Sequence, residues 1–472
     1  MAHQDHGRKD IECSQAHDLH RALRWLLARI TLPSAGWRFD CTWAPLKLVF
    51  AGLLWAWSDE RTLIDRFITS RKMIVHLYPH DAKPAKSYQA FLKLLRKWTG
   101  VWLDLLREAF RQRTASLAQV WKVAGWIVFA GDGSRIDVPR TRSNEQHYAP
   151  QSALARAARR RVKRSRRTKR RRAQELRQRK ANVPQIWLTA LWHVGSGLPW
   201  DWRTGPSDSS EREHLRQMLP AMPKNSLLTA DAGFVGYPMW EAILAAGHHL
   251  LIRVGGNVRL LQKLGYARER QGLVYLWSDR AAKKRLPPLV LRLIVVHGPR
   301  HPLYLVTSVM DTTELSQTQA TEIYRRRWGI ELFYRHCKQT FERRKLRSHN
   351  ADNAMLELHW SLLGVWAMGL HSHHRLVPRG VLPERISFAK VLRAYRRSMR
   401  EYKSPPDPGE RLLQLLDQAI LDNYPRRDKT SRDYPRKKQE SAAGAPIIQI
   451  ATAAQIRAAN DLKANYRKRL TA

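Results

Sequence analysis

Cysteines and acidic residues are scarce in this chain of 472 residues. The three cysteines, Cys13, Cys41 and Cys337, are an odd number without paired ligand spacing, which argues against both a disulfide framework and a structural zinc site. Only 40 residues are Asp or Glu, against 84 that are Lys or Arg, so the formal net charge is +44. Such a surplus is most simply explained by a polyanionic partner, and nucleic acid is the first candidate.

Long hydrophobic runs are also missing. The longest, such as LKLVFAGLLWAW at residues 46–57, are too short to span a bilayer and predict buried helices instead. The first residues lack the apolar core of a secretory signal, so we expect a protein of the reducing cytoplasm without a membrane partner. What is present is a hydrophobic content of 43%, enough for two or three domains with cores of their own.

Residues 1–120 predict an all-helical region. Between residues 16 and 119, apolar residues recur three or four positions apart, and basic residues lie between them. We expect these basic helices to bind DNA, although no helix-turn-helix pattern is clear.

Residues 121–345 predict an α/β core. From Trp126 the pattern changes to short apolar runs that alternate with helical segments, an order that favours a partly parallel sheet. Residues 255–310 are rich in strand patterns and predict a β subdomain inserted ahead of the last helix of the core. Residues 346–472 predict a helical C-terminal region and tail, which we assign to assembly.

A basic tract, RAARRRVKRSRRTKRRRAQELRQRK at residues 156–180, falls between two predicted strands and has Glu175 as its only acid. Such a run is usually a solvated, disordered tract. The alternative is a helix or loop that lines a DNA channel. Either form can bind phosphates, because releasing counterions requires charge rather than a fold.

Two aspartates, Asp132 in DGS and Asp231 in DAGF, each end a predicted strand. In α/β sheets ligands collect at the carboxyl ends of strands, and two aspartates there can share divalent cations such as Mg²⁺. Both could instead cap turns, and Asp137 is a rival carboxylate. We interpret Glu211 and Glu213 as surface or capping acids.

The segment YRRRWGIELFYRHCK predicts a helix with a narrow polar face. At 100° per residue, four side chains share an arc of about 60°: Tyr324, Arg327, Glu331 and Lys338. The face could be a solvated salt-bridge face, in which Glu331 pairs with an arginine four residues away, or an active-site wall. Trp328 could pack in the core or act as a wedge between bases.

These residues also match a known signature. The segment resembles that of DDE transposases of bacterial insertion sequences, the insertion-sequence-four group: Tyr, two residues, Arg, three residues, Glu, six residues, Lys. LYLVTS before the helix, RWGIE within it, DGS and LTADAGF resemble the neighbourhoods usual in that family and come in the same order. The resemblance runs from about Gly125 to Trp366. The family usually has threonine where this chain has Ser134.

The resemblance implies an α/β fold: a ribonuclease H-like catalytic core with an inserted β subdomain, flanked by all-helical N- and C-terminal regions. It implies a catalytic and metal-binding triad of Asp132, Asp231 and Glu331 that holds two Mg²⁺ ions, with Mn²⁺ as a substitute. Four further residues are expected to contact DNA: Tyr324, Arg327, Lys338 and Trp328.

The function implied is that of an insertion-sequence transposase, which cuts the element's ends and joins them to target DNA. Double-stranded DNA is the expected partner, with a homodimer in the DNA complex. The expected location is the bacterial cytoplasm, in association with the nucleoid. Two alternatives stay open: a nuclease of the same fold that does not join DNA, and an inactive basic protein that packages DNA.

Overall fold

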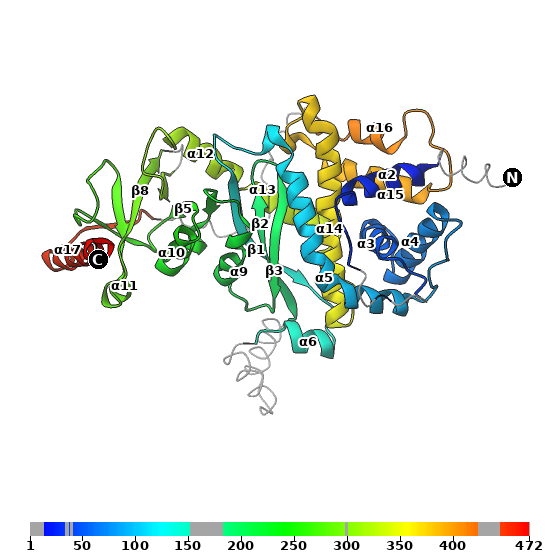
Figure 1. Cartoon of the computed structure of the whole chain (residues 1–472), viewed down its shortest axis with the longest axis horizontal. Coiled ribbons are helices and arrows are strands. Elements are labelled where there is room, and N and C mark those ends of the chain that lie inside the picture. The colour runs from blue at the N-terminus through cyan, green and yellow to red at the C-terminus, as the bar shows by residue number, and fades with distance from the viewer. Residues whose placement is uncertain are drawn as a thin grey trace, which may run out of the picture.

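The computed structural model describes residues 14–33, 37, 41–151, 183–297, 301–422 and 444–471. The basic tract at residues 156–180 lies outside these described residues. Ten strands form one sheet: β1 (Val128–Asp137), β2 (Gln185–His193), β3 (Leu198–Gly205), β4 (Leu227–Ala230), β5 (His249–Val254), β6 (Arg259–Gln262), β7 (Leu273–Leu276), β8 (Leu289–Val296), β9 (Leu303–Thr307) and β10 (Ile447–Ile450). Their order in the sheet is β10-β6-β7-β8-β9-β5-β4-β1-β2-β3 (Figure 1).

Strands β1 to β5 form a ribonuclease H-like core. β1, β2 and β3 make an antiparallel meander, and β4 and β5 pair in parallel on the other side of β1. Parallel neighbours need crossover connections, which α9 (Glu211–Met218) and α10 (Tyr237–Ala245) supply before and after β4. The predicted α/β core with a partly parallel sheet is therefore confirmed.

The strands expected between residues 255 and 310 are present as β6 to β9, and they extend the same sheet. β9 pairs antiparallel with β5, and β8, β7 and β6 follow outward. Beyond them lies β10, which comes from the region that we expected to be helical and pairs in parallel with β6. Its sequence, IIQI, is rich in β-branched residues, and these favour a strand.

Helices cover both faces of this sheet. Successive residues of β1 point to opposite faces. Val128 and Ala130 share one hydrophobic core with α5 (Tyr88–Ala115) and α14 (Ala351–Leu376), while Phe129 shares another with α9 and α10. α14 is buried around most of its circumference, as expected for a helix wedged between the sheet and further helices.

The remaining helices surround this centre. On the side of α5 and α14 away from the sheet lie five of them (Figure 1): α2 (Gln15–Leu27), α3 (Pro45–Trp57), α4 (Leu63–Leu77), α15 (Phe388–Arg400) and α16 (Leu412–Asp417). Three short or peripheral helices lie elsewhere: α6 (Arg142–Tyr148), α11 (Asp279–Lys283) and α17 (Ala453–Thr471). None of the helices in the described parts of the chain combines the length and apolar content that crossing a membrane requires.

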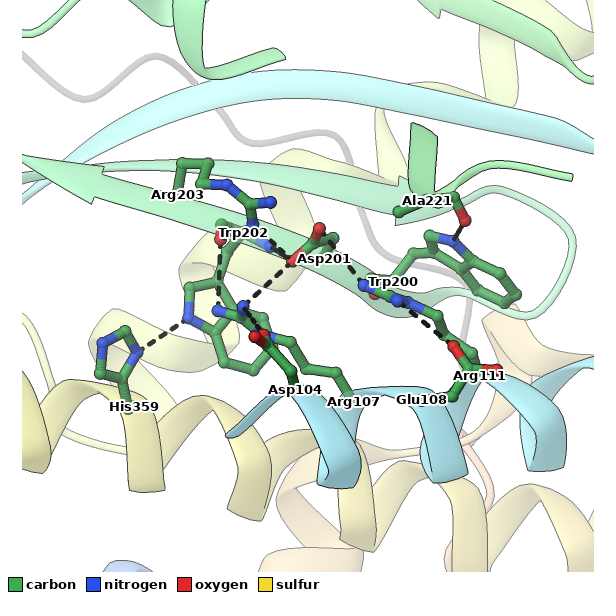
Figure 2. Close-up of polar contacts among 10 residues, drawn as sticks. All are labelled: Asp104, Arg107, Glu108, Arg111, Trp200, Asp201, Trp202, Arg203, Ala221 and His359. Atoms are coloured by element: carbon green, nitrogen blue, oxygen red, sulfur yellow. Dashed lines mark hydrogen bonds and ion pairs between the residues drawn. The ribbon is translucent and has the colours of Figure 1, made fainter. Parts of the chain in front are cut away.

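A buried ion cluster joins the N-terminal helices to the sheet. Figure 2 shows Asp201 of β3 facing Arg107 and Arg111 of α5. Its carboxylate, 2% exposed, lies 3.5 Å from Arg107, 3.2 Å from Arg111 and 2.9 Å from Arg203. On the same strand, Trp202 donates its indole N–H to His359 Nδ1 of α14 at 3.0 Å. These contacts fix α5 and α14 relative to the β3 edge of the sheet.

Candidate active site

Asp132 lies in the middle of a strand, so the expectation that it ends one is wrong. β1 continues to Asp137 because its polar second half stays paired with β2, where Asp132 lies opposite Ala190. On the other side, however, β4 stops at Ala230. Asp132 therefore lies where β1 loses one of its two neighbouring strands, next to the residue at which the chain leaves β4.

Asp231 follows β4 directly, as the sequence predicts. β1 and β4 are parallel with Ala130 opposite Thr229, and continuing this register by two residues sets Asp132 beside Asp231. Neighbouring strands are about 4.8 Å apart, so the two carboxylates share one site. Asp231 Oδ1 also accepts a hydrogen bond from Gly233 N at 2.8 Å. Capping this turn and facing Asp132 are therefore compatible roles.

The motif segment is not a single helix. It consists of α12 (Gln317–Arg326), α13 (Gly329–Arg335) and a π-helical turn at His336–Thr340, so the expected arc of about 60° is interrupted. The interruption lies at Arg327 and Trp328, directly before Gly329, where a Cβ atom would come within 2.0 Å of the Trp192 ring on β2. Glycine allows the chain to approach the sheet here. This approach brings the first turn of α13, which carries Glu331, to the site.

Glu331 lies at the edge of the aspartate pair. Its side chain is 47% exposed, and its Oε1 is 4.0 Å from Arg327 Nη2. At that distance and exposure the ion pair contributes little to stability. Burial, with a smaller contribution from the nearby charges of Asp231 and Glu331, raises the pKa of Asp132 to about 6 against the opposing effects of the Gly133 amide and Arg327. The three predicted triad residues are thus electrostatic neighbours.

Glu211 is a fourth carboxylate of the site, and the sequence analysis missed it. It is the first residue of α9, and a Cβ atom at Gly133 would lie 2.1 Å from its Oε1. Burial, followed by the charges of Asp132 and Asp231, raises the pKa of Glu211 to about 7. The signal in the sequence is Gly133 itself, since a glycine beside a catalytic aspartate leaves room for a neighbour. Glu213 instead pairs at the surface with Arg216 at 3.0 Å, as expected.

Tyr334 ties the motif segment to the catalytic strand. The hydroxyl of this buried tyrosine donates to the carbonyl oxygen of Asp132 at 2.6 Å and accepts from Ala190 N at 3.0 Å. Tyr334 lies one turn after Glu331 on α13. It therefore fixes the helix that carries Glu331 against the residue that carries Asp132.

The predicted DNA-contact residues occupy different depths. Tyr324 and Arg327 are each 4% exposed, whereas Trp328 is 52% exposed. The Arg327 guanidinium lies between the two rings, 5.2 Å from the Tyr324 centroid and 5.1 Å from the Trp328 centroid. Contact of these residues with DNA stays a prediction. Because Trp328 is the exposed one of the three, a DNA strand can reach it without rearrangement of the protein.

Lys338 lies beside the catalytic strand. Its Nζ donates to Ser134 Oγ at 2.7 Å, and burial lowers the pKa of Lys338. Asp137, the rival carboxylate, accepts a hydrogen bond from Gln185 Nε2 at 2.7 Å. Lys338, in the π-helical turn, thus contacts β1 two residues after Asp132, and its contact with DNA stays a prediction.

The donor set suits a hard divalent cation. In the described part of the chain no three His, Cys, Asp or Glu side chains are close enough together to ligate a metal ion as they stand. The carboxylates of Asp132, Asp231 and Glu331 nevertheless offer oxygen ligands, and the charges of Asp231 and Glu331 make ionisation of Asp132 more costly. A cation bound among them would relieve that repulsion, so the residues fit the ion.

A ribonuclease H-like sheet that brings two aspartates and a later glutamate together defines the class of DDE domains. The chain belongs to this class, because residues 127–366, just over half of its length, match the family described as Transposase DDE domain. It is 26% identical over 274 residues to the transposase InsG for insertion sequence element IS4 of Escherichia coli (strain K12), which covers 55% of this chain and 61% of that protein. The chain thus spans about three fifths of the length of this curated relative.

A solved structure, the piggyBac transposase synaptic complex with hairpin DNA, is also similar. It covers 87% of this chain and 84% of its own, at 14% sequence identity and a TM-score of 0.39. At this low level the similarity supports no argument about function.

Proposed function

We propose that the protein is an insertion-sequence transposase that cuts DNA at the ends of its element and joins them to target DNA. The observation that carries this proposal is the register of β1 and β4, which sets Asp132 beside Asp231, with Glu331 at their edge. Membership of the DDE family and the net charge of +44 support it.

Asp132, Asp231 and Glu331 are the residues that would hold two Mg²⁺ ions, with Mn²⁺ as a substitute. When bound, such a pair of ions stabilises the charge on the attacking and leaving oxygens of a displacement at phosphorus. Glu211, whose pKa is about 7, is placed to adjust the charge of the site or accept a proton.

Cleavage is a hydrolysis, and joining is a transesterification. In the first, a water oxygen bonds to phosphorus, the bond from phosphorus to the 3′-oxygen breaks, and the water proton leaves through the carboxylate cluster. In the second, the oxygen of the freed 3′-hydroxyl bonds to a target phosphorus and the bond from that phosphorus to the target's 3′-oxygen breaks. The attacking hydroxyl gives up its proton, and the leaving oxygen takes up a proton to become a new 3′-hydroxyl. The residues of the chain orient the strand: Lys338 beside Ser134, and Arg327 behind Glu331, provide cations on the same side as the acids.

The partner in this proposal is double-stranded DNA, both the element's ends and the target. We also propose a homodimer in the DNA complex, because two ends must be cut together, and association with the nucleoid. The relative's name supports an insertion-sequence element as the substrate.

The test is cleavage of a duplex that carries the DNA flanking the reading frame, in Mg²⁺ or in EDTA. We expect wild type to cut the duplex in Mg²⁺ but not in EDTA, and Glu331→Gln to bind the duplex without cutting it. Glu322→Gln is the matched control, because Glu322 lies on α12 and pairs at the surface with Arg326 at 2.9 Å. Cutting without strand-transfer products would favour the nuclease, and Mg²⁺-independent binding without cutting would favour the packaging protein.

A further inference from the structure

The exposed face of α5 carries opposite charge in its two halves. In the second half its exposed charged residues are acids, Asp104 and Glu108, whose side chains are 84% and 55% exposed. In the first half, four exposed residues recur three or four positions apart and share an arc of about 60° on the helix. We call them the α5 stripe: Gln89, Lys93, Arg96 and Gly100.

The two cations of the stripe have no partner in the described parts of the chain, because the side chains of Lys93 and Arg96 make neither an ion pair nor a hydrogen bond there. The arginines in the second half of α5 differ, since Arg107 and Arg111 pair with Asp201 of β3. These arginines hold the helix against the sheet, whereas the cations of the stripe remain available to an anion from outside the chain.

Gly100 lies in the interior of α5 without a packing reason. Glycine destabilises a helix interior relative to alanine. At three other glycines inside helices, a Cβ atom would come within 3.0 Å of a side chain from another element: Gly52, Gly364 and Gly369. At Gly100 no atom of the described residues lies within 4 Å of that position. The missing side chain therefore leaves room for a molecule outside the chain.

The stripe lies near the candidate active site and on the same face of the sheet. Asp132 shares a face of β1 with Ala130, which packs in one core with α5. Strand pairing sets Asp132 in one row with Trp202 of β3, whose carbonyl accepts a hydrogen bond from Arg107 at 3.3 Å. Gly100 precedes Arg107 by about 10 Å of helix, and β3 is about 10 Å from β1. The stripe is thus within one turn of duplex, about 34 Å, of Asp132.

The chemistry of the stripe favours DNA as its partner. The stripe has no apolar side chain, which a lipid surface or a stable protein interface would require. Residues 82–103 contain no Asp or Glu, so nothing in this stretch of sequence repels a polyanion. Duplex DNA carries a phosphate about every 3.4 Å along each strand, and the roughly 10 Å from Lys93 to Gly100 therefore spans about three phosphates.

We propose that the α5 stripe binds the sugar-phosphate backbone of duplex DNA, with Lys93 and Arg96 on neighbouring phosphates and the backbone of α5 against the DNA at Gly100. This inference rests on the proposed function. It names the surface by which the N-terminal helices hold the DNA that is cut at the candidate active site.

The first experiment measures how salt affects the binding of a duplex from beside the reading frame to wild type, Lys93→Gln and Arg96→Gln. Each phosphate contact contributes about 0.9 to the slope of log affinity against log salt, so each variant should lose about that amount. Arg96→Lys should retain most of the slope. Lys283→Gln is the matched control, because it removes an exposed cation from α11, well away from α5 (Figure 1), and it should leave the slope unchanged.

The second experiment fills the space at Gly100. Gly100→Ala and Gly100→Gln should both melt above wild type, because either residue favours a helix more than glycine does and no described neighbour is in the way. Gly100→Gln should nevertheless bind the duplex about threefold to tenfold more weakly, because its side chain holds the phosphates away from Lys93 and Arg96. Val101→Gln is the control, since Val101 is 50% exposed but turned about 100° from Gly100, and it should bind like wild type.

A higher melting temperature together with weaker DNA binding in one variant is a result that a purely structural role would not produce. Unchanged slopes in the two stripe variants, an equal loss in Lys283→Gln, or full affinity in Gly100→Gln would overturn the inference. Weaker binding with a lower melting temperature in Gly100→Gln would assign Gly100 to the fold and would also overturn it. Absence of cleavage by wild type would instead contradict the proposed function, since these readouts are independent of cutting.

Discussion

Asp132 on β1 and Asp201 on β3 belong to the same antiparallel meander, yet their surroundings have opposite charge. Asp201 is 2% exposed and lies within 3.5 Å of three arginines. Asp132 is partly buried, and its electrostatic neighbours include Asp231 and Glu331. One sheet therefore holds one aspartate whose charge is neutralised by the fold and one whose charge is not.

The difference separates a structural carboxylate from a functional one. A buried ion pair with complete partners fixes the position of two elements, although it adds little net stability compared with apolar packing. A cluster of like charges destabilises the fold and persists where a ligand of opposite charge completes it. On this comparison, Asp201 holds α5 against the sheet, and Asp132 is the aspartate that we propose takes part in the chemistry.

The largest expected effect is on the rate of DNA cleavage, which should depend on the carboxylates around Asp132 and not on the ion cluster around Asp201. Asp132→Asn or Asp231→Asn should reduce the cleavage rate at least roughly 10³- to 10⁴-fold, because several kcal/mol of charge stabilisation are lost. Asp104→Asn, at an exposed aspartate that pairs with Arg107 in the other region, should cut within about twofold of wild type. Rates of cutting an end-labelled duplex measure both. Similar losses in all three variants would remove the distinction.

The next effect is on stability and concerns the ion cluster around Asp201 rather than the candidate active site. Asp201→Ala should lower the free energy of unfolding by about 3–5 kcal/mol, because the buried Arg107 loses its buried counterion and keeps only the exposed Asp104. Arg203→Gln removes one of three cations, with a side chain 32% exposed, and should cost about 1 kcal/mol or less. Denaturant titration measures both values. An equal cost for the two variants would contradict a cluster centred on Asp201.

A smaller effect on stability is expected for Asp132→Asn, which should increase the free energy of unfolding. Asp132→Asn removes a carboxyl whose pKa in the folded protein, about 6, is above its ordinary value. The folded state then binds protons more tightly than the unfolded state, so this group's contribution to stability falls as the pH rises from about 4 to about 6. In EDTA at pH 8 we expect the variant to be more stable by about 1–2 kcal/mol. The gain should fall to about a third of that value at pH 4.5, and a gain independent of pH would contradict the charge argument.

The smallest effect concerns the carboxylate that the sequence analysis missed. Glu211→Gln should slow cleavage by about 10-fold, because it borders Asp132 and Asp231 without replacing either. The pH profile of the rate should also change near pH 7, the pKa of Glu211. Glu213→Gln, two residues on and at the surface, is the matched control. An unchanged rate and profile in Glu211→Gln would place Glu211 outside the site.

The sequence predicts the elements whose signals are local. The alternation of strands and helices, the helices before residue 120 and the position of Asp231 after β4 all follow from short-range patterns and are confirmed. β1 was predicted too short, because its second half, DGSRID, is polar and is held by pairing with β2 rather than by its own composition. A strand stabilised by its neighbour leaves little trace in its own residues.

Prediction of the site from the sequence is limited for the same reason. The spacing of the motif residues locates Glu331, but the close approach of Gly329, directly after the break between α12 and α13, is to Trp192, far away in the sequence. Glu211 and Tyr334 reach Asp132 across the fold, through contacts that a single sequence does not encode locally. β10 is four residues long, too short for its pattern to distinguish a strand from the neighbouring helix.

The central claim, that the clustered carboxylates form a site completed by a divalent cation, is tested most directly by melting temperatures. Wild type and Asp132→Asn would be compared at pH 7.5 in EDTA and in rising Mg²⁺ or Mn²⁺. We predict that wild type melts lower in EDTA and rises with metal toward saturation, because the ion binds the folded state alone, while the variant starts higher and gains much less. Equal increases in both proteins, or no increase in wild type, would contradict the claim.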